Sequence, residues 1–283
     1  MMNGTRRSAV GATHPWRDVT VDGVRLAADD EGAGTPALVC LHAIGHGARD
    51  FAALRRAFAP AHRVVALDWP GQGNSADDSR PPSAARYAAL LAGVLDALGI
   101  ERVVLVGNSI GGAAALRYAA THPERVAGLV LENPGGLDRP DRLSRRVIDL
   151  MVRFFAAGSR RAAWFPPAFA AYYRTVLQRS AAAAQRARIV ASAYEIAPVL
   201  HDAWVSFGAP DADLRNLVPT IRCPTLFAWG VRDVAVQLRR SLPTIARFPN
   251  ARLERFAAGH AAHLETPEEL VAAVRRFVGA QKL

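Results

Sequence analysis

A serine flanked by two glycines follows a continuous apolar run. Residues 107–111 read Gly-Asn-Ser-Ile-Gly, directly after Val103–Val106 and before an alanine-rich stretch. A strand that turns sharply into a helix needs glycines here, because side chains two positions either side of Ser109 would collide with neighbouring backbone. The hydroxyl then projects from the sheet edge, beside a helix N-terminus that favours negative charge. This pattern predicts an α/β fold with a serine displayed at a strand-to-helix turn.

Length, composition and charge limit the classes of protein to which this sequence can belong. The 283 residues, 51% of them hydrophobic, allow one large α/β domain or one domain with an insertion. The net charge of +10 comes from arginines scattered along the chain, without a dense basic run, which argues against nucleic-acid binding. Apolar stretches shorter than the roughly 18–20 residues of a membrane span, and no signal-peptide core, predict a cytoplasmic protein. Cys40 and Cys223 lie in or beside apolar runs and are expected to be buried reduced thiols.

Apolar, β-branched runs alternate with longer amphipathic stretches. Most of the apolar runs lack alternation, as expected for parallel strands buried on both faces, so the rhythm predicts a doubly wound, mostly parallel sheet. The expected strands are 18–27, 37–42, 63–68, 102–107, 126–132, 225–230 and 252–256. The expected helices are 48–58, 83–98, 110–121, 237–246 and 267–278.

The rhythm stops between about Asn133 and Val218. That stretch has no convincing strand and is typical of several helices, with a loop expected at Trp164–Pro167. We therefore expect a flexible N-terminal arm over residues 1–16, an α/β core over 17–134 and 219–283, and a helical cap over 135–218. Ligands are expected at the carboxyl ends of the strands, under this cap.

Four separated motifs resemble those of the α/β-hydrolase family. They are Leu41-His42-Ala43-Ile44-Gly45, the run Asp68-Trp69-Pro70-Gly71-Gln72-Gly73-Asn74-Ser75, the segment 107–112, and Gly259-His260 with Glu265 and Pro267. Each stands at the end of an expected strand, and their order matches the family. The resemblance implies an α/β-hydrolase fold with a helical cap inserted after a late strand.

The resemblance also implies a catalytic triad. Ser109 is the expected nucleophile, because a serine hydroxyl becomes reactive when a neighbouring base takes its proton. His260 is the expected base, with His263 as its rival three residues on. Asp233, after the expected strand 225–230, is the expected acid, with Glu132 as the alternative. The order Ser, Asp, His is the one this fold carries.

The remaining site residues follow from the same motifs. The backbone N–H groups of Ile44 and Ile110 are expected to hold the oxyanion. His42 and Asp68 are expected to shape the loops. His46 is expected to face solvent, with a position at the pocket mouth as the alternative. In the cap, Trp164, Arg188 and Trp204 are the candidate substrate contacts, with Phe165, Tyr172 and Tyr173 as further aromatic candidates.

These residues predict a serine hydrolase that cleaves a carboxylic ester, or a closely related acyl bond, of a small, largely apolar substrate through an acyl-enzyme. The first alternative is a C–C bond hydrolase of a vinylogous diketone. Asn108, the run Asn133–Leu137 and Arg188 resemble those enzymes, whereas the oxyanion loop 42–47 and Ala261 depart from them. The third hypothesis is a non-catalytic binding protein on the same scaffold. No metal spacing or phosphate-binding glycine loop occurs, so neither a metal nor a cofactor is expected.

Overall fold

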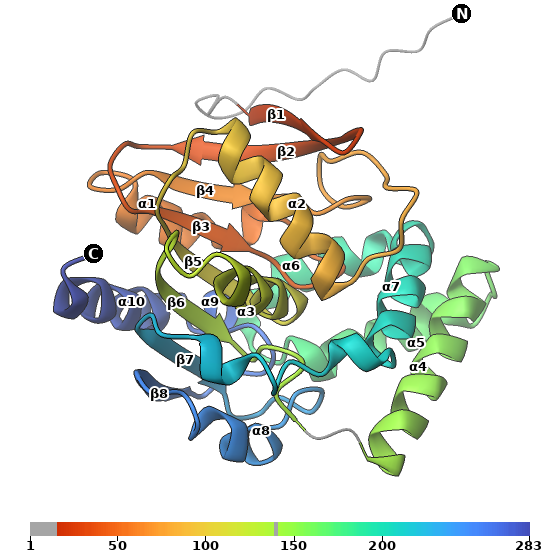
Figure 1. Cartoon of the computed structure of the whole chain (residues 1–283). Helices are drawn as coiled ribbons and strands as arrows, with labels where there is room; N and C mark the ends of the chain where they lie inside the picture. The colour runs from red at the N-terminus through yellow and green to blue at the C-terminus, as the bar shows by residue number, and fades with distance from the viewer. Residues whose placement is uncertain (1–15, 139–140) are drawn as a thin grey trace, which may run out of the picture.

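The computed structural model describes residues 16–138 and 141–283, and its centre is one 8-stranded sheet in the order β1-β2-β4-β3-β5-β6-β7-β8 (Figure 1). β1 pairs antiparallel with β2 and β2 with β4, and every later pairing is parallel. The strands are β1 (Trp16–Val21), β2 (Val24–Glu31), β3 (Ala37–Leu41), β4 (Val64–Leu67), β5 (Val103–Asn108), β6 (Val126–Glu132), β7 (Thr225–Gly230) and β8 (Ala251–Phe256).

One expected strand was wrong. The run 18–27 folds as two antiparallel strands, because Asp22 and Gly23 take φ values of 50° and 78° between them. An Asp-Gly pair with positive φ at both residues is the favoured two-residue hairpin turn. Trp16, assigned to the N-terminal arm, instead begins β1, and the rest of that arm lies outside the described residues.

Helices cover both faces of the sheet and create two apolar cores. α2 (Ala84–Ala97), α3 (Ile110–Thr121) and α8 (Leu238–Ile245) pack on one face, where Leu105 and Leu131 belong to the larger core. α1 (Ala52–Phe58), after the 3-10 turn η1 (Ala48–Phe51), and α10 (Pro267–Gln281) pack on the other face (Figure 1). Because β3, β5 and β6 are buried along their whole length, their carboxyl ends form a rigid edge.

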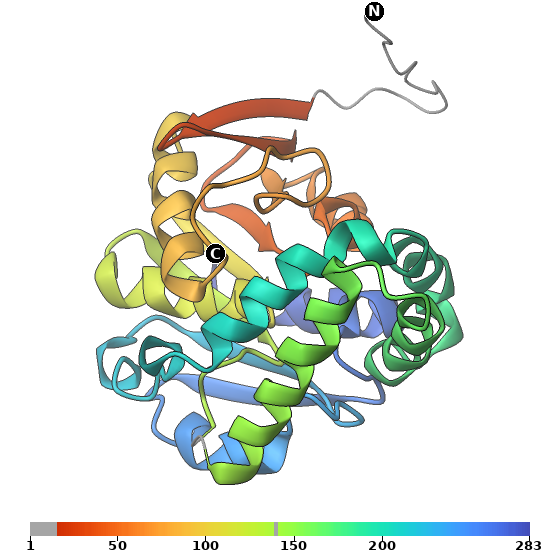
Figure 2. The ribbon, with the colours of Figure 1, turned by 90° about the vertical axis from the view of Figure 1, so that its right-hand side faces the viewer.

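Helices fill the interval between β6 and β7. They are α4 (Arg142–Ser159), α5 (Phe165–Val176), α6 (Ala183–Ala191) and α7 (Ala193–Phe207), with short 3-10 turns η2 (Ser180–Ala182), η3 (Pro210–Ala212) and η4 (Val218–Thr220). Figure 2 shows α4 and α7 side by side across the front of the molecule.

The loop expected at Trp164–Pro167 was wrong, because α5 begins at Phe165 and both prolines lie in its first turn. Proline is tolerated there, since N–H groups in the first turn have no partner within the helix.

No helix in the described ranges is both long and apolar enough to cross a membrane. Both cysteines carry free thiols. Cys40 is buried as expected, and Cys223 is only partly buried. Burial raises the pKa of the Cys223 thiol to about 11.

Candidate active site

Ser109 lies at the turn between β5 and α3 in a conformation that few residues adopt. Its φ of 56° and ψ of −119° fall outside the helical and strand regions. A Cβ on Gly107 would lie 2.7 Å from the Gly111 carbonyl oxygen, and one on Gly111 would lie 2.2 Å from that of Leu41. The two glycines are therefore required by close backbone approach, as the sequence pattern predicts.

Asp233 and His260 meet at the ends of β7 and β8. His260 Nδ1 and Asp233 Oδ2 are 2.7 Å apart, and both side chains are buried. Burial opposes the charged imidazolium, but the Asp233 carboxylate outweighs this effect and raises the pKa of His260. The other carboxylate oxygen accepts hydrogen bonds from the Ala235 and Val236 amides. The carboxylate thus fixes the orientation of the imidazole through Nδ1 and leaves Nε2 available to bond another group.

Asn133, directly after β6, supports the carboxylate. Its Nδ2 donates to Asp233 Oδ2 at 2.8 Å, and its Oδ1 accepts from the Gly230 amide at 2.8 Å. The residue has a φ of 42°, which asparagine tolerates better than most side chains. Beyond the family resemblance, no role for Asn133 was predicted, because its hydrogen bonds join positions about a hundred residues apart.

Asn108 connects the serine turn to the histidine loop. Its Nδ2 donates to the carbonyl of His260 at 2.8 Å and to that of Glu132 at 3.0 Å. Because Asn108 immediately precedes Ser109, one amide group fixes His260 relative to the serine turn. Ser109 Oγ makes no hydrogen bond within the described residues, and such contacts in an unliganded site are often loose.

The cap is bonded to the same histidine loop. The His260 amide donates to the Val176 carbonyl at 2.9 Å, at the last residue of α5. Glu265 Oε2 accepts from the amides of Gln178 and Arg179, and its Oε1 accepts from Gly259. One buried carboxylate therefore joins the α5–α6 connection to the residue before the histidine.

Glu132 and His263, the sequence-level rivals for acid and base, pair with each other. Glu132 Oε2 accepts from His263 N and lies 3.0 Å from its Nδ1. Phe51 stacks on the imidazole with ring centroids 4.5 Å apart. Burial opposes protonation of His263, but the Glu132 carboxylate outweighs it and raises the pKa of the imidazole. Neither residue contacts Asp233 or is hydrogen-bonded to His260.

Hydrogen bonds with the loop after β4 hold the expected oxyanion loop in place. Gln72 Oε1 accepts the Gly45 amide at 2.6 Å, and Gly45 has a φ of 80°. The Trp69 amide donates to His42 Nε2, so Nδ1 carries the proton and faces the Ala43 carbonyl. Burial lowers the pKa of His42, consistent with this neutral, structural tautomer. The N–H groups of Ile44 and Ile110 donate to no acceptor within the described residues.

Asp68 also has a structural role, because its carboxylate accepts the backbone amides of Ala48 and Asn74. The bond from Ala48 joins the loop after β4 to the start of η1, and the bond from Asn74 closes the loop after β4 on itself.

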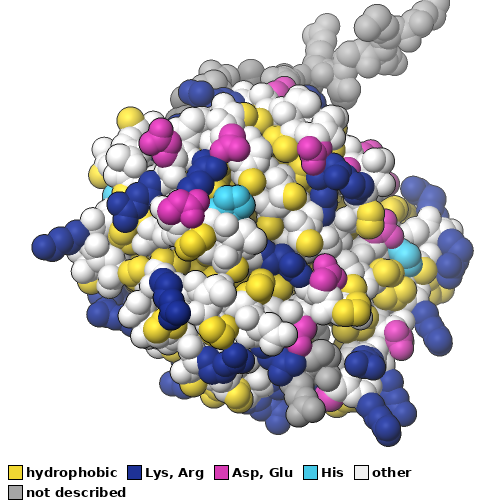
Figure 3. Space-filling model, in the orientation of Figure 1, with side chains coloured by type: hydrophobic (Ala, Val, Ile, Leu, Met, Phe, Trp, Pro, Cys, Tyr) yellow, Lys and Arg dark blue, Asp and Glu magenta, His cyan; other side chains and the backbone are white. Residues whose placement is uncertain are grey.

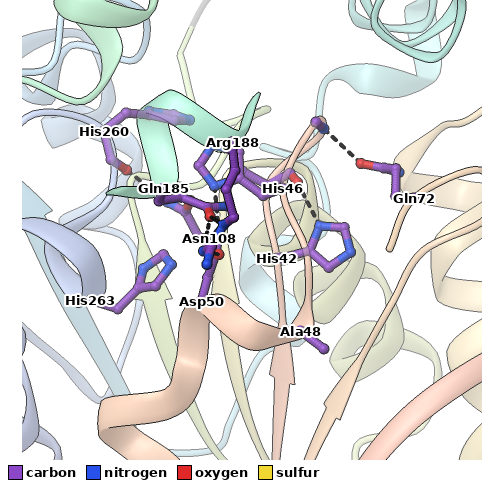
Figure 4. A network of polar contacts seen from close by, with 12 residues as sticks. His42, His46, Ala48, Asp50, Gln72, Asn108, Gln185, Arg188, His260 and His263 are labelled. Atoms are coloured by element: carbon purple, nitrogen blue, oxygen red, sulfur yellow. Dashed lines mark hydrogen bonds and ion pairs between the residues drawn. The ribbon is translucent and has the colours of Figure 1, made fainter. Parts of the chain in front are cut away.

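A second polar cluster joins η1 to α6 and the loop after β3, and it corrects the expectation for His46. This side chain is buried rather than exposed to solvent, with Nδ1 2.8 Å from Asp50 Oδ2. Arg188 Nη2, from α6, lies 3.8 Å from Asp50 Oδ1, and its guanidinium also bonds Gln185. Burial disfavours the charged Asp50, but its bond with His46 outweighs this and lowers the pKa of the carboxyl. Figure 4 shows these four side chains together.

The aromatic candidates in the cap have different surroundings. Trp164 is 54% exposed and packs on Phe154, whereas Trp204 is half-buried against Phe155. Tyr173 is buried beside His46, and its hydroxyl would contact a side chain at Gly45. Ser109 and His260 are only 9% and 7% exposed in this structure.

The chain belongs to the family described as alpha/beta hydrolase fold, whose profile matches residues 36–267. It is 46% identical over 133 residues to the 2-hydroxy-6-oxononadienedioate/2-hydroxy-6-oxononatrienedioate hydrolase of Burkholderia vietnamiensis, a match covering 44% of this chain and 46% of that protein. The match to that relative thus spans less than half of its length. It is 30% identical to the 2-hydroxy-6-oxo-6-phenylhexa-2,4-dienoate hydrolase of Burkholderia cepacia, over 85% of this chain and 86% of that one.

Solved structures give the same fold. A membrane phospholipase A described as a bacterial virulence factor superposes with a TM-score of 0.81 at 26% identity, covering 95% of this chain and 86% of that chain. An esterase from Thermogutta terrifontis superposes with a TM-score of 0.78 at 22% identity, over 94% and 99% of the two chains.

Proposed function

We propose that the protein is a serine hydrolase that cleaves a carboxylic ester of a small, largely uncharged substrate. The observation that carries the proposal is the 2.7 Å contact between His260 Nδ1 and Asp233 Oδ2, beside a serine held at a positive φ of 56°. A carboxylate that fixes the imidazole tautomer leaves Nε2 to act as a base toward Ser109. The cytoplasmic location expected from the sequence stays a prediction.

In the proposed reaction, His260 Nε2 takes the proton of Ser109 Oγ as Oγ bonds the ester carbonyl carbon. The negative charge on the carbonyl oxygen is held by the N–H groups of Ile44 and Ile110, which donate to nothing else in the described residues. The intermediate expels the alkoxide, which takes the proton from His260. Water, deprotonated by His260, then attacks the acyl-enzyme. As the second tetrahedral intermediate collapses, His260 returns this proton to Ser109 Oγ and the carboxylic acid is released.

Burial of Asp50 favours an uncharged substrate. Its lowered pKa keeps a negative charge beside Arg188, and the guanidinium is already shared between Asp50 and Gln185. A substrate carboxylate bound at Arg188 would therefore lie close to the buried Asp50 carboxylate, and the two like charges would repel each other.

A fluorophosphonate probe followed by mass spectrometry tests the proposal, with Ser109→Ala as the control. Labelling of Ser109 alone, together with turnover of p-nitrophenyl esters that the variant lacks, is the expected result. An unlabelled, folded protein without esterase activity would favour the third hypothesis, that of a binding protein on a hydrolase scaffold.

C–C bond hydrolysis is the second candidate, because Arg188 reaches the site from α6 and because named relatives carry that activity. Arg188→Ala separates the two. It is expected to abolish turnover of a dienoate diketone if that is the substrate, while sparing neutral esters. Asp50→Asn gives a second readout, since removing the buried charge should improve an anionic substrate more than a neutral one.

A further inference from the structure

α4 presents apolar side chains to solvent that nothing in the described structure covers. Leu143, Val147 and Leu150 are 65%, 45% and 64% exposed, and their spacing of four and three residues aligns them on one stripe of the helix. The opposite side of α4 is anchored in the fold through Phe155, which is fully buried. The exposed stripe is therefore additional to the face that packs in the core.

The stripe continues toward the beginning of α5. Phe154, one turn after Leu150, lies with its ring centroid 6.0 Å from that of Trp164, which is 54% exposed. Of the eight large hydrophobic side chains exposed in the described residues, five belong to the cap, the fifth being Val205 at the end of α7. Exposed apolar side chains gathered on one surface mark a binding face rather than ordinary scatter.

A basic row runs beside the stripe. Arg142, Arg146 and Arg153 are exposed, and their spacing of four and seven residues places them on one edge of α4, interrupted only by Asp149. None of these arginines has an ion-pair partner among the residues that the structure describes. Figure 3 shows Lys and Arg side chains along the lower right edge of the molecule, over α4.

We propose that this face of α4 docks on a membrane surface that contains anionic lipid. Leucine and valine side chains enter the boundary between headgroups and acyl chains, while the arginine stems lie along it and their guanidinium groups bind lipid phosphates. The proposal does not rest on the chemistry proposed for Ser109.

Charge selects this partner over two others. Nucleic acid would satisfy the arginines but leave the leucines against phosphate and water. A second copy of the chain would cover the leucines, but it would bring a net charge of +10 and an identical arginine row toward the first. An anionic lipid surface offers apolar chains to the leucine and valine stripe and phosphate groups to the arginine row.

Flotation of the full chain with lipid vesicles tests the proposal. Vesicles of phosphatidylcholine mixed with phosphatidylglycerol should bind the protein, and phosphatidylcholine alone should bind it at least tenfold more weakly. Leu143→Ser combined with Leu150→Ser should weaken binding at least tenfold, and Arg146→Gln combined with Arg153→Gln should do the same. Emission of Trp164, measured against Trp164→Phe, should shift to shorter wavelength on binding, because its exposed ring would leave water.

A matched control removes the same charge elsewhere. Arg252→Gln combined with Arg255→Gln, both exposed on β8, should leave vesicle binding within twofold of the original protein. Equal losses in the two arginine pairs would mean that overall charge and not α4 drives binding, which overturns the proposal. So would an absence of vesicle binding, or a dimer that the leucine variant converts to monomer. The circular dichroism melt of each variant shows whether it is folded.

Discussion

Replacing Asn108 with alanine tests whether one amide group sets the position of the histidine loop. In the described residues, Asn108 Nδ2 is the only donor to the His260 carbonyl, whereas the Glu132 carbonyl keeps the Ser109 amide. The variant therefore leaves one buried carbonyl without a partner, at a cost of about 1–3 kcal/mol. For a chain of this size, each kcal/mol lowers Tm by roughly 2–4 °C.

The kinetic effect should exceed what lost stability explains. His260 would keep its bond to Asp233 but lose the tie that fixes it relative to Ser109. A displacement of about 1 Å can reduce a rate by roughly 10²-fold, so we expect kcat for an ester to fall by roughly 10- to 100-fold with KM little changed. The assay is p-nitrophenyl ester hydrolysis well below the Tm of the variant.

Asn250→Ala is the matched control, because Asn250 Nδ2 also donates to one backbone carbonyl, that of Arg222, but on the surface. It should change neither kcat nor KM. An Asn108→Ala enzyme with the original kcat, or one whose kcat loss is equalled by Asn250→Ala, would refute the reasoning.

Three further predictions follow from the same contacts. The raised pKa of His260 keeps the imidazole protonated to higher pH, so the acid limb of kcat should have its midpoint above the ordinary value of about 6.5. Asp233→Asn should move this midpoint down, because it removes the main effect that opposes burial, and a midpoint below about 6.5 in the original enzyme contradicts the reasoning. Glu265→Gln should cost about 1.5–3 kcal/mol in urea unfolding, since an amide cannot accept all three backbone N–H bonds, and an unchanged midpoint counts against that role. Gly111→Ala should destabilise the protein by about 1–3 kcal/mol, because its Cβ would lie 2.2 Å from the Leu41 oxygen, and a stable, active variant would disprove the collision.

The parts of the fold that sequence predicts well are those with local signals. The bounds of helix 110–121 were predicted to the residue, and those of the central strands nearly so. The signals for these elements, apolar runs bounded by glycines, lie within a few neighbouring positions of the sequence. The hairpin at Asp22-Gly23 was missed although its turn signal is present, because the flanking residues read as one continuous run. The prolines at 166–167 were wrongly predicted to form a loop, because proline is common both in the first turn of a helix and at positions that interrupt a helix.

The supporting residues of the site were less accessible to sequence. Glycine and serine spacing identifies the turn at Ser109, but the bonds of Asn108, Asn133 and Glu265 join residues that meet only after the sheet and cap assemble. His46 was expected in solvent, because a loop position gives no sign that Asp50 and Tyr173 will enclose it. Burial of a polar side chain is a tertiary property, and no local pattern encodes it.

The bonds between cap and histidine loop constrain how substrate reaches Ser109. The α5–α6 connection holds the His260 amide through Val176 and the preceding residue through Glu265. A rigid-body lift of the whole cap would break these bonds and displace the base that the reaction needs. We therefore expect any opening to leave the end of α5 in place. None of these bonds involves α4 or α7, which pack on each other (Figure 2). The helix that carries the exposed leucines makes none of these bonds to the histidine loop, so a displacement of α4 is not expected to disturb His260.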